Sequence, residues 1–450
     1  MAKEKSTILQ RILSQERQEQ TQIEHDVFES QVLRPDKDEL EISENVIKSI
    51  SQKFKYRISD EGLTDDVKED IRTQVDIEVK AIASTYEKQM RLRKIILDSM
   101  FGLGPIEQYM SPKSTVTDII VHRFDHICVK DSTGTHQVDA EFNSEDHLRN
   151  VISRIVQQAG RQINLATPAV DAKLPDGSRI HATIPPVTPD GATLTVRRFN
   201  QIKLTPEKYI ELETLSPEML KFLKFCVEHK INILVAGGTD SGKTTLLNML
   251  SSFIPDDELI VTIEDNCELQ LKHPHVRRME ARQSSLEADS ITIQDLVRHS
   301  LRMSPDRIIV GEVRDGSIVD MLSAMSIGHE GSMSTVHTDS PRTLMDSRLP
   351  TLFSQYNVHF QRETENLMIA EAVQIVVQIS AIADSKRRIT YITAVNGIGE
   401  DGNIELVDLF RFNRRTKTFY CTGAIPDVLM ESFSDKGCDM DEVKRMLQIE

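Results

Sequence analysis

The chain has 450 residues, of which 39% are hydrophobic, and its formal net charge is −16. This length accommodates two or three domains, and the acidic balance disfavours wholesale binding to nucleic acid, so we predict no nucleic-acid partner. No apolar run approaches the ~18 residues of a membrane span, and the N-terminus lacks the apolar segment of a signal peptide. The five scattered cysteines form no C-x-x-C, which supports neither a disulfide framework nor a zinc ribbon. We therefore expect a cytoplasmic protein whose contact with a membrane is peripheral.

The N-terminal stretch changes character near residue 60. Residues 1–60 are polar and rich in Gln, Glu, Ser and Lys, which predicts a mobile arm with some helix. Between Thr64 and Met100 apolar residues recur at helical spacing, and Thr64 is a suitable N-cap. One or two amphipathic helices are predicted there.

A compact α+β domain is predicted over residues 61–204. Short apolar runs between 115 and 140 indicate strands, and Ser144 caps a helix that extends to Ala159. Further strands follow and end in the basic stretch before Phe199.

After a linker over residues 205–215, a second domain is predicted over residues 216–450. Ser216 followed by Pro217 opens a helix that runs to about His229. Apolar segments then alternate with helical ones, which favours a mostly parallel sheet with helices on both faces. A hairpin turns over residues 413–416, and no internal repeat occurs. The fold class is therefore α/β, preceded by the smaller α+β domain and the helical arm.

A phosphate-binding motif opens this sheet. The apolar run 231–236 predicts a buried strand, and it is followed by G-x-x-x-x-G-K-[ST] and the start of a helix. Backbone N–H groups of such a loop point at phosphate oxygens, and the helix N-terminus adds partial positive charge. Lys243 is expected to reach the outer phosphates and the Thr244 hydroxyl to hold Mg²⁺. The predicted phosphate-binding residues are Gly237, Gly238, Thr239, Asp240, Ser241, Gly242, Lys243, Thr244 and Thr245.

Asp240 conflicts with an anionic ligand. Aspartate tolerates left-handed backbone, so the loop conformation is compatible with it, but its charge repels phosphate unless it points to solvent. An inward carboxylate would nearly prevent nucleotide binding, and we expect the outward orientation, because the other motifs of the chain keep every residue type that catalysis needs.

Acidic residues follow two later strands of the predicted sheet. Glu264, Asp265 and Glu268 come after one strand, and Glu312 with Asp315 comes after another. The C-terminal ends of parallel strands share one edge with the phosphate loop, where acids hold Mg²⁺ and position water. Ordinary exposed acids at strand ends are the alternative.

Two histidines occur in GHEGSMSTVHT. His329 and His337 lie too far apart for a helical metal pair, and the small residues between them suggest a loop that feeds a short strand. His337 is a candidate for sensing the terminal phosphate or polarising water, and a structural histidine remains an equal alternative.

Taken in order, GGTDSGKTT, IEDNCEL, RIIVGEVRDG and GHEGSMSTVHT resemble the Walker A, Asp box, Walker B and His box of type II/type IV secretion-system ATPases. Upstream, LPDGSRIHATIPPV and TLTVRRF look like the CpaF branch of that superfamily, which powers Tad/Flp pilus assembly. The resemblance covers about residues 95–425. Two departures are Asp240, where Gly is usual, and Thr338, where Ala is commoner.

The resemblance implies a homohexameric ring that hydrolyses ATP with Mg²⁺ at the cytoplasmic face of the inner membrane. It also implies a RecA-like domain capped by the N-terminal domain, with ATP in the cleft between them. The partner implied is the inner-membrane platform protein of a pilus or secretion apparatus.

The same resemblance assigns roles to individual residues. Glu312 would activate the attacking water, Glu264 and Glu268 would assist with Mg²⁺ and water, and His337 would approach the phosphates. Arginines of the N-terminal domain and linker would reach the phosphates from across the gap, where they stabilise developing charge; these match Arg179, Arg197 and Arg198. For Arg197 and Arg198 an exposed basic strand end is the alternative.

Two other functions stay open. One is a nucleotide-gated scaffold without enzymatic activity, which Asp240 would favour if it cripples turnover. The other is a different P-loop class, although a helicase would want a basic channel and an ABC subunit would want an L-S-G-G-Q signature that is not found.

Overall fold

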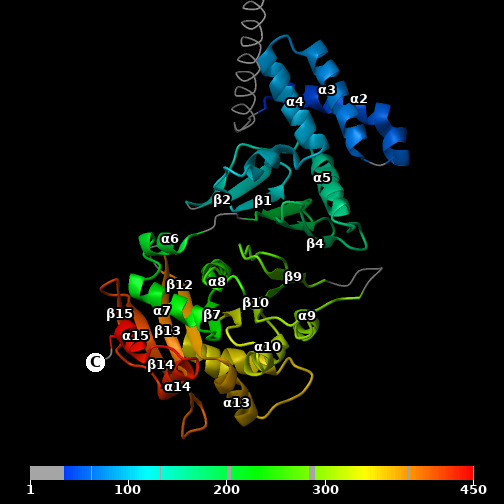
Figure 1. The fold of residues 1–450 in the computed structure, drawn as a ribbon. Coiled ribbons are helices and arrows are strands. Elements are labelled where there is room, and N and C mark those ends of the chain that lie inside the picture. The colour runs from blue at the N-terminus through cyan, green and yellow to red at the C-terminus, as the bar shows by residue number, and fades with distance from the viewer. Residues whose placement is uncertain are drawn as a thin grey trace, which may run out of the picture. The chain divides into compact units, whose positions relative to one another are not determined.

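The computed structural model describes residues 35–61, 63–131, 133–199, 204–282, 289–382 and 386–448. The chain divides into two units, Met1–Asn200 and Gln201–Glu450, which Figure 1 draws in blue to green and in green to red. In the ranges just given, no helix combines the length and the apolar character that a membrane crossing requires.

The described part of the first unit begins with three helices: α2 (Lys37–Glu61), α3 (Asp65–Ile82) and α4 (Tyr86–Met100). The Thr64 side chain accepts a hydrogen bond from the Val67 amide, so the predicted N-cap is confirmed. They bury one apolar cluster that includes Val46, Ile50, Val67, Ile71, Val75, Val79, Leu92 and Ile96.

The predicted mobile arm over residues 1–60 needs a correction in its second half. Residues 37–61 form α2, because Val46 and Ile50 lie four residues apart on one helix face and are buried against α3 and α4. The few apolar residues of this stretch therefore suffice to pack α2 against α3 and α4. The arm's first 34 residues lie outside the described residues.

A six-stranded antiparallel sheet completes the first unit, in the order β3-β2-β1-β6-β5-β4. Helix α5 contributes Leu148, Val151 and Ile155 to the same core as this sheet, and its predicted N-cap Ser144 accepts from the His147 amide. The remaining elements of the unit are η1 (Gly104–Met110), β1 (Asp118–Arg123), β2 (His126–Asp131), β3 (Gly134–Gln137), α5 (Glu145–Gln158), β4 (Ala169–Lys173), β5 (Arg179–Thr183) and β6 (Thr193–Arg197).

The second unit alternates strands and helices as predicted. Its N-terminal helix α6 falls inside the stretch predicted as a linker, and Ser216 caps α7 through the Met219 amide. The elements are α6 (Pro206–Glu211), α7 (Pro217–Glu228), β7 (Ile233–Gly237), α8 (Lys243–Ser251), β8 (Ile260–Glu264), β9 (Val276–Glu280), α9 (Ile293–Ser300), β10 (Arg307–Val313), α10 (Ser317–Ser326), β11 (Met333–His337), α11 (Pro341–Thr343), η2 (Leu344–Arg348), α12 (Leu349–Phe353), α13 (Arg362–Ala372), β12 (Ile375–Ala381), β13 (Arg387–Ile398), β14 (Ile404–Asn413), β15 (Thr418–Cys421), α14 (Asp427–Asp435) and α15 (Met440–Met446).

The nine strands form one mixed sheet in the order β15-β14-β13-β12-β7-β11-β10-β8-β9. From β12 to β9 every neighbouring pair is parallel, whereas β12 to β15 pair antiparallel. The fold is thus α/β, with a parallel part that carries the phosphate loop and an antiparallel extension.

Strand β7 lies at the centre of this sheet and is buried on both faces. Ile233 and Val235 belong to a core that contains residues of α7, α8 and α14, while Leu234 and Ala236 belong to a second core with residues of α9, α10 and α13. Successive strand residues point to opposite faces, so this one strand contributes side chains to both cores.

Candidate functional site

The parallel strands bring the predicted motifs to one edge of the sheet. Gly237, the last residue of β7, pairs with His337 of β11 on one side and with Ile379 of β12 on the other. Strand β10 pairs in parallel with both β11 and β8, so Glu312 and Glu264 end on the same edge. The phosphate loop, the two acidic strand ends and His337 therefore lie along four neighbouring strands.

Close packing shapes the phosphate loop. A Cβ atom at Gly237 would lie 2.4 Å from the Ile379 carbonyl oxygen, so only glycine fits there. Gly242 caps α8 with a φ of 95°, a left-handed conformation that glycine adopts without strain. The motif and its strand–loop–helix context are thus present as predicted.

Lys243 folds back over its own loop. Its Nζ donates a hydrogen bond of 2.9 Å to the Gly238 carbonyl oxygen, as the Ser241 hydroxyl also does. Burial lowers the pKa of Lys243, and the charges of Glu312 and Asp240 oppose that shift. A phosphate group would supply a charged acceptor for this partly desolvated ammonium in place of a neutral carbonyl.

Asp240 has a left-handed backbone with a φ of 56°, and its side chain is exposed. The backbone agrees with the expected tolerance of aspartate for this region, and the exposure agrees with the outward orientation. Its carbonyl oxygen accepts a 2.9 Å hydrogen bond from Arg387 Nε.

Glu264 is buried at the end of β8. Its Oε1 accepts hydrogen bonds of 2.9 Å from the amides of Glu268 and Leu269, while no described residue bonds its buried Oε2. Burial raises the pKa of Glu264, and the two amide donors oppose that effect. Strand β10 leaves room for this side chain only because residue 311 is glycine, where a Cβ would lie 2.9 Å from Glu264 Cγ.

Glu312 is only partly buried and lies in a charged environment. Its Oε2 accepts a 2.6 Å hydrogen bond from Arg314, whose pKa is raised first by that bond and further by Asp265 and Glu268. The charges of Asp265 and Glu268 thus act on Arg314 as well as that of Glu312, and the strands that carry the two acidic groups, β8 and β10, are parallel neighbours.

The two predicted histidines have different surroundings. His337 is half-buried and pairs in register with Gly237, which places it beside the start of the phosphate loop. His329 precedes β11, and its Nδ1 is bonded to the Pro305 carbonyl at 2.9 Å, which is a structural role.

The residues at this edge suit Mg²⁺ together with a phosphate ligand. Mg²⁺ prefers hard oxygen ligands and is commonly held by one or two carboxylates with substrate phosphates. Thr244 in the first turn of α8 and the unpartnered Oε2 of Glu264 are such oxygens. Among the described residues no three acidic, histidine or cysteine side chains are grouped closely enough to hold a metal by themselves.

The three predicted arginines all lie in the first unit. Arg179 and Arg197 are register partners across β5 and β6. The guanidinium of Arg198 instead donates to four carbonyl groups of the same unit, and this engagement argues against its predicted reach to a nucleotide. The acceptors are the carbonyl oxygens of Met110, Ser111, Ser114 and Val116.

Sequence reasoning missed two cations of this site. Arg314 could have been found, because it follows Glu312 by two residues at the same strand end. Arg387 had no signal, since it begins an antiparallel strand far along the chain and meets the loop only through the order of the strands.

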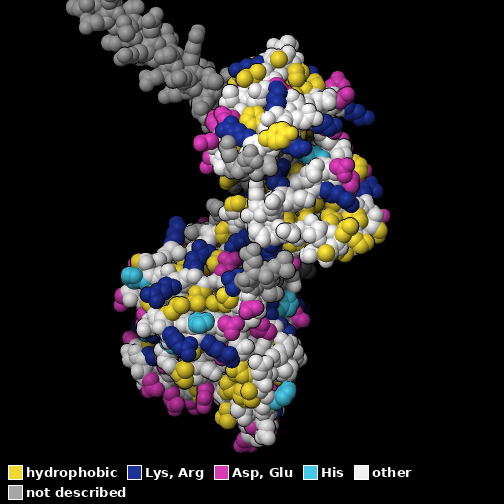
Figure 2. All heavy atoms as spheres, turned by 90° about the vertical axis from the view of Figure 1, so that its right-hand side faces the viewer, with side chains coloured by type: hydrophobic (Ala, Val, Ile, Leu, Met, Phe, Trp, Pro, Cys, Tyr) yellow, Lys and Arg dark blue, Asp and Glu magenta, His cyan; other side chains and the backbone are white. Residues whose placement is uncertain are grey.

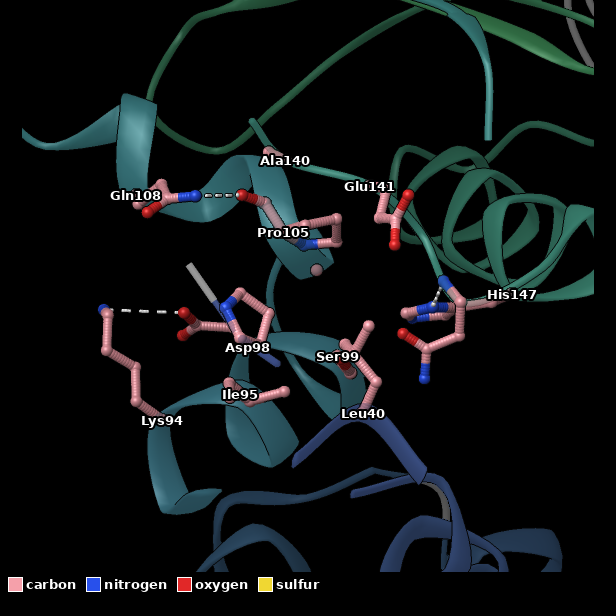
Figure 3. A pocket seen from close by; sticks show the side chains of 13 residues that line it. Leu40, Lys94, Ile95, Asp98, Ser99, Pro105, Gln108, Ala140, Glu141 and His147 are labelled. Atoms are coloured by element: carbon pink, nitrogen blue, oxygen red, sulfur yellow. Dashed lines mark hydrogen bonds and ion pairs between the residues drawn. The ribbon is translucent and has the colours of Figure 1, made fainter. Parts of the chain in front are cut away.

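A separate pocket lies in the first unit and is lined by residues of α2, α4, η1, α5 and the segment that precedes α5 (Figure 3). Figure 3 shows Lys94, Ile95 and Asp98 on one side of it and Glu141 and His147 on the other. Burial lowers the pKa of His147 to about 4, with Arg154 adding to the effect, so this imidazole is neutral at pH 7.

Comparison with known proteins gives consistent matches. Residues 100–420 match the family model described as type II/IV secretion system protein. A putative conjugal transfer protein of Mycobacterium tuberculosis is 31% identical over 328 residues, which are 71% of this chain and 92% of that protein. Type IV secretion system protein PtlH of Bordetella pertussis is 31% identical over 264 residues, covering 53% of this chain and 77% of that one. Among solved structures, this chain is similar to the VirB11 ATPase from the Brucella suis type IV secretion system, crystallised in complex with sulphate. The sequence identity is 26%, the match covers 63% of this chain and 89% of that chain, and the TM-score is 0.36.

Proposed function

Because this chain belongs to the type II/IV secretion system protein family, we propose that it is a motor ATPase of such a system. It hydrolyses ATP and uses the free energy to drive pilus assembly or protein secretion at the cytoplasmic face of the inner membrane. Its second unit is the RecA-like catalytic domain.

The observation that carries this proposal is the convergence of unlike groups at one sheet edge. Strand β7 delivers the phosphate loop with Lys243, β8 delivers the buried carboxyl of Glu264, and β10 delivers Glu312. A nucleotide triphosphatase requires this combination, since it must hold phosphates, position water and offset developing charge.

Each residue has a defined task in the proposed reaction. Lys243 and the loop amides bind the outer phosphates, and Glu312 orients the attacking water and accepts its proton. Glu264 is held by two amides, so that its free oxygen keeps a fixed direction. Mg²⁺ held by Thr244 and the acids would neutralise negative charge on the phosphates. His337 and Glu268 assist from neighbouring strand ends.

The proposed assembly is a homohexamer docked on an inner-membrane platform protein, as the CpaF-like motifs imply. Arg179 and Arg197 are proposed to stabilise negative charge on the phosphates during hydrolysis. This arrangement explains why basic residues stand at adjoining ends of β5 and β6.

Lys243→Ala tests the proposed reaction. We expect the purified full-length protein to release phosphate from ATP, with or without phospholipid vesicles, and the variant to lose this turnover while it still assembles. The lysine contributes charge at the phosphates and little to the core. Lys224→Ala, on the exposed face of α7, is the matched control and should keep the wild-type rate.

Two outcomes would contradict the proposal. Normal turnover in Lys243→Ala would remove the phosphate loop from the mechanism. A wild-type protein that binds ATP without hydrolysing it under every condition would favour the nucleotide-gated scaffold.

A further inference from the structure

The β12–β13 hairpin supports the phosphate loop on the side away from the acids. Ile379 of β12 pairs with Gly237, and its carbonyl oxygen leaves no space for a side chain there. Arg387, the first residue of β13, pairs with Ala381 at the end of the same hairpin. The hairpin thus places Arg387 next to the loop.

Arg387 contacts the loop at its two left-handed residues. Its Nε donates a 2.9 Å hydrogen bond to the Asp240 carbonyl, and its Cδ would lie 3.2 Å from a Cβ at Gly242. The φ angles are 56° at Asp240 and 95° at Gly242. The side chain therefore covers the stretch where the chain turns into α8.

Aspartate tolerates left-handed backbone better than most residues, but this conformation still costs it more than glycine, which adopts it nearly without strain. A hydrogen bond to the Asp240 carbonyl favours the conformation in which that carbonyl faces Arg387. Without the bond, residue 240 would leave the left-handed region more often, and the loop amides would converge on a phosphate less often.

The residues on either side of Arg387 anchor its strand elsewhere. Lys386 Nζ and Arg388 Nη2 bond the Glu213 carboxylate at 2.7 and 3.1 Å, and the Ile389 amide bonds the Thr214 carbonyl at 2.8 Å. Because alternate strand residues point to opposite faces, Lys386 and Arg388 both bond Glu213, whereas Arg387, between them, bonds the loop.

We propose that Arg387 is a positioning residue that holds the phosphate loop in its nucleotide-binding conformation by fixing the left-handed backbone of Asp240. This inference rests on the proposed function, because the loop's ligand is taken to be ATP. Arg387 raises the affinity for nucleotide and leaves the chemical step to the acids of β8 and β10.

Arg387→Ala tests the proposal through a split between KM and kcat. The KM for ATP should rise about tenfold, the order expected when a left-handed non-glycine residue loses its support, while kcat stays within about twofold. The Kd for ATP measured by titration calorimetry should rise equally, and the melting temperature should stay unchanged. Arg414→Ala, exposed in the turn between β14 and β15, is the matched control.

Combining Arg387→Ala with substitutions of Asp240 shows whether Arg387 affects ATP affinity through the backbone conformation of residue 240 or through its charge. In an Asp240→Gly background the affinity lost on removing Arg387 should fall to about twofold, because glycine adopts the left-handed region unaided. In an Asp240→Asn background the loss should remain about tenfold, because asparagine keeps a backbone preference like that of aspartate without the charge.

Three results would overturn the proposal. These are an unchanged affinity in Arg387→Ala, a fall in kcat at constant KM, and an equal loss of affinity in all three backgrounds, which would indicate direct contact with the nucleotide. The Kd is readable even if the wild-type protein never hydrolyses ATP, so failure of the proposed function is recognised separately.

Discussion

Two glutamates at neighbouring strand ends have opposite surroundings. Glu264 is buried, and two backbone amides hold one of its oxygens. Glu312 is more exposed, and its carboxylate forms an ion pair of 2.6 Å with the exposed side chain of Arg314. A rigid carboxyl suits the positioning of ligands, whereas an accessible one can orient water and accept a proton. These different environments support the proposal that Glu312, rather than Glu264, is the base.

Glu312→Gln should keep nucleotide binding and slow hydrolysis by at least ~100-fold, the usual contribution of a positioned base. Single-turnover hydrolysis and ATP titration together measure both effects. Glu363→Gln, exposed in the first turn of α13, serves as the control for loss of a carboxylate. If binding is lost and the rate at saturation is unchanged, Glu312 holds the metal or the fold instead.

At the scale of elements, the loop depends on how closely β12 approaches β7. The two strands are parallel, and the Ile379 carbonyl occupies the space that a side chain at residue 237 would need. The adjacent Gly238 has no atom within 4 Å of its Cβ position. The two consecutive glycines thus differ, because packing requires glycine at residue 237, whereas a side chain at residue 238 would meet open space.

Gly237→Ala should destabilise the protein by about 1–3 kcal/mol, because backbone of β12 must move to admit the methyl group. The melting temperature should fall by roughly 2–10 °C. Gly238→Ala is the matched comparison and should leave the melting temperature within about one degree, since its methyl group meets open space. Equal shifts in the two variants would show that β12 does not confine the loop.

At the scale of the whole molecule, each unit has hydrophobic clusters of its own. Two clusters belong to residues of the first unit and two to residues of the second. Figure 2 shows basic, acidic and apolar side chains interspersed over the face that it presents. Each unit therefore buries its own apolar side chains, as a separately folding domain does.

The proposed motor should assemble into a ring. In the presence of a non-hydrolysable ATP analogue, light scattering should give a mass near six chains of 51.1 kDa. A lone subunit cannot coordinate successive strokes around a translocated substrate. A monomer at every protein concentration and in every nucleotide state would exclude the motor.

The sequence by itself determined the local features of this protein. The N-caps at Thr64, Ser144 and Ser216, the phosphate-loop motif and the acids at the ends of β8 and β10 were predicted correctly. Capping and periodicity depend on residues within about four positions of each other, so they are legible in a linear sequence. The common edge also followed, because parallel strands end on the same side.

Only the tertiary structure decided how distant residues are used. Four features join residues that have no regular spacing in the sequence. They are the burial of Glu264, the hydrogen bonds from Arg198 to four carbonyl groups, the packing of α2 against α3 and α4, and the hydrogen bond from Arg387 to Asp240. Such contacts follow from the order of strands in the sheet and from the packing of helices. These depend on the summed burial of many side chains, and no single motif encodes that sum.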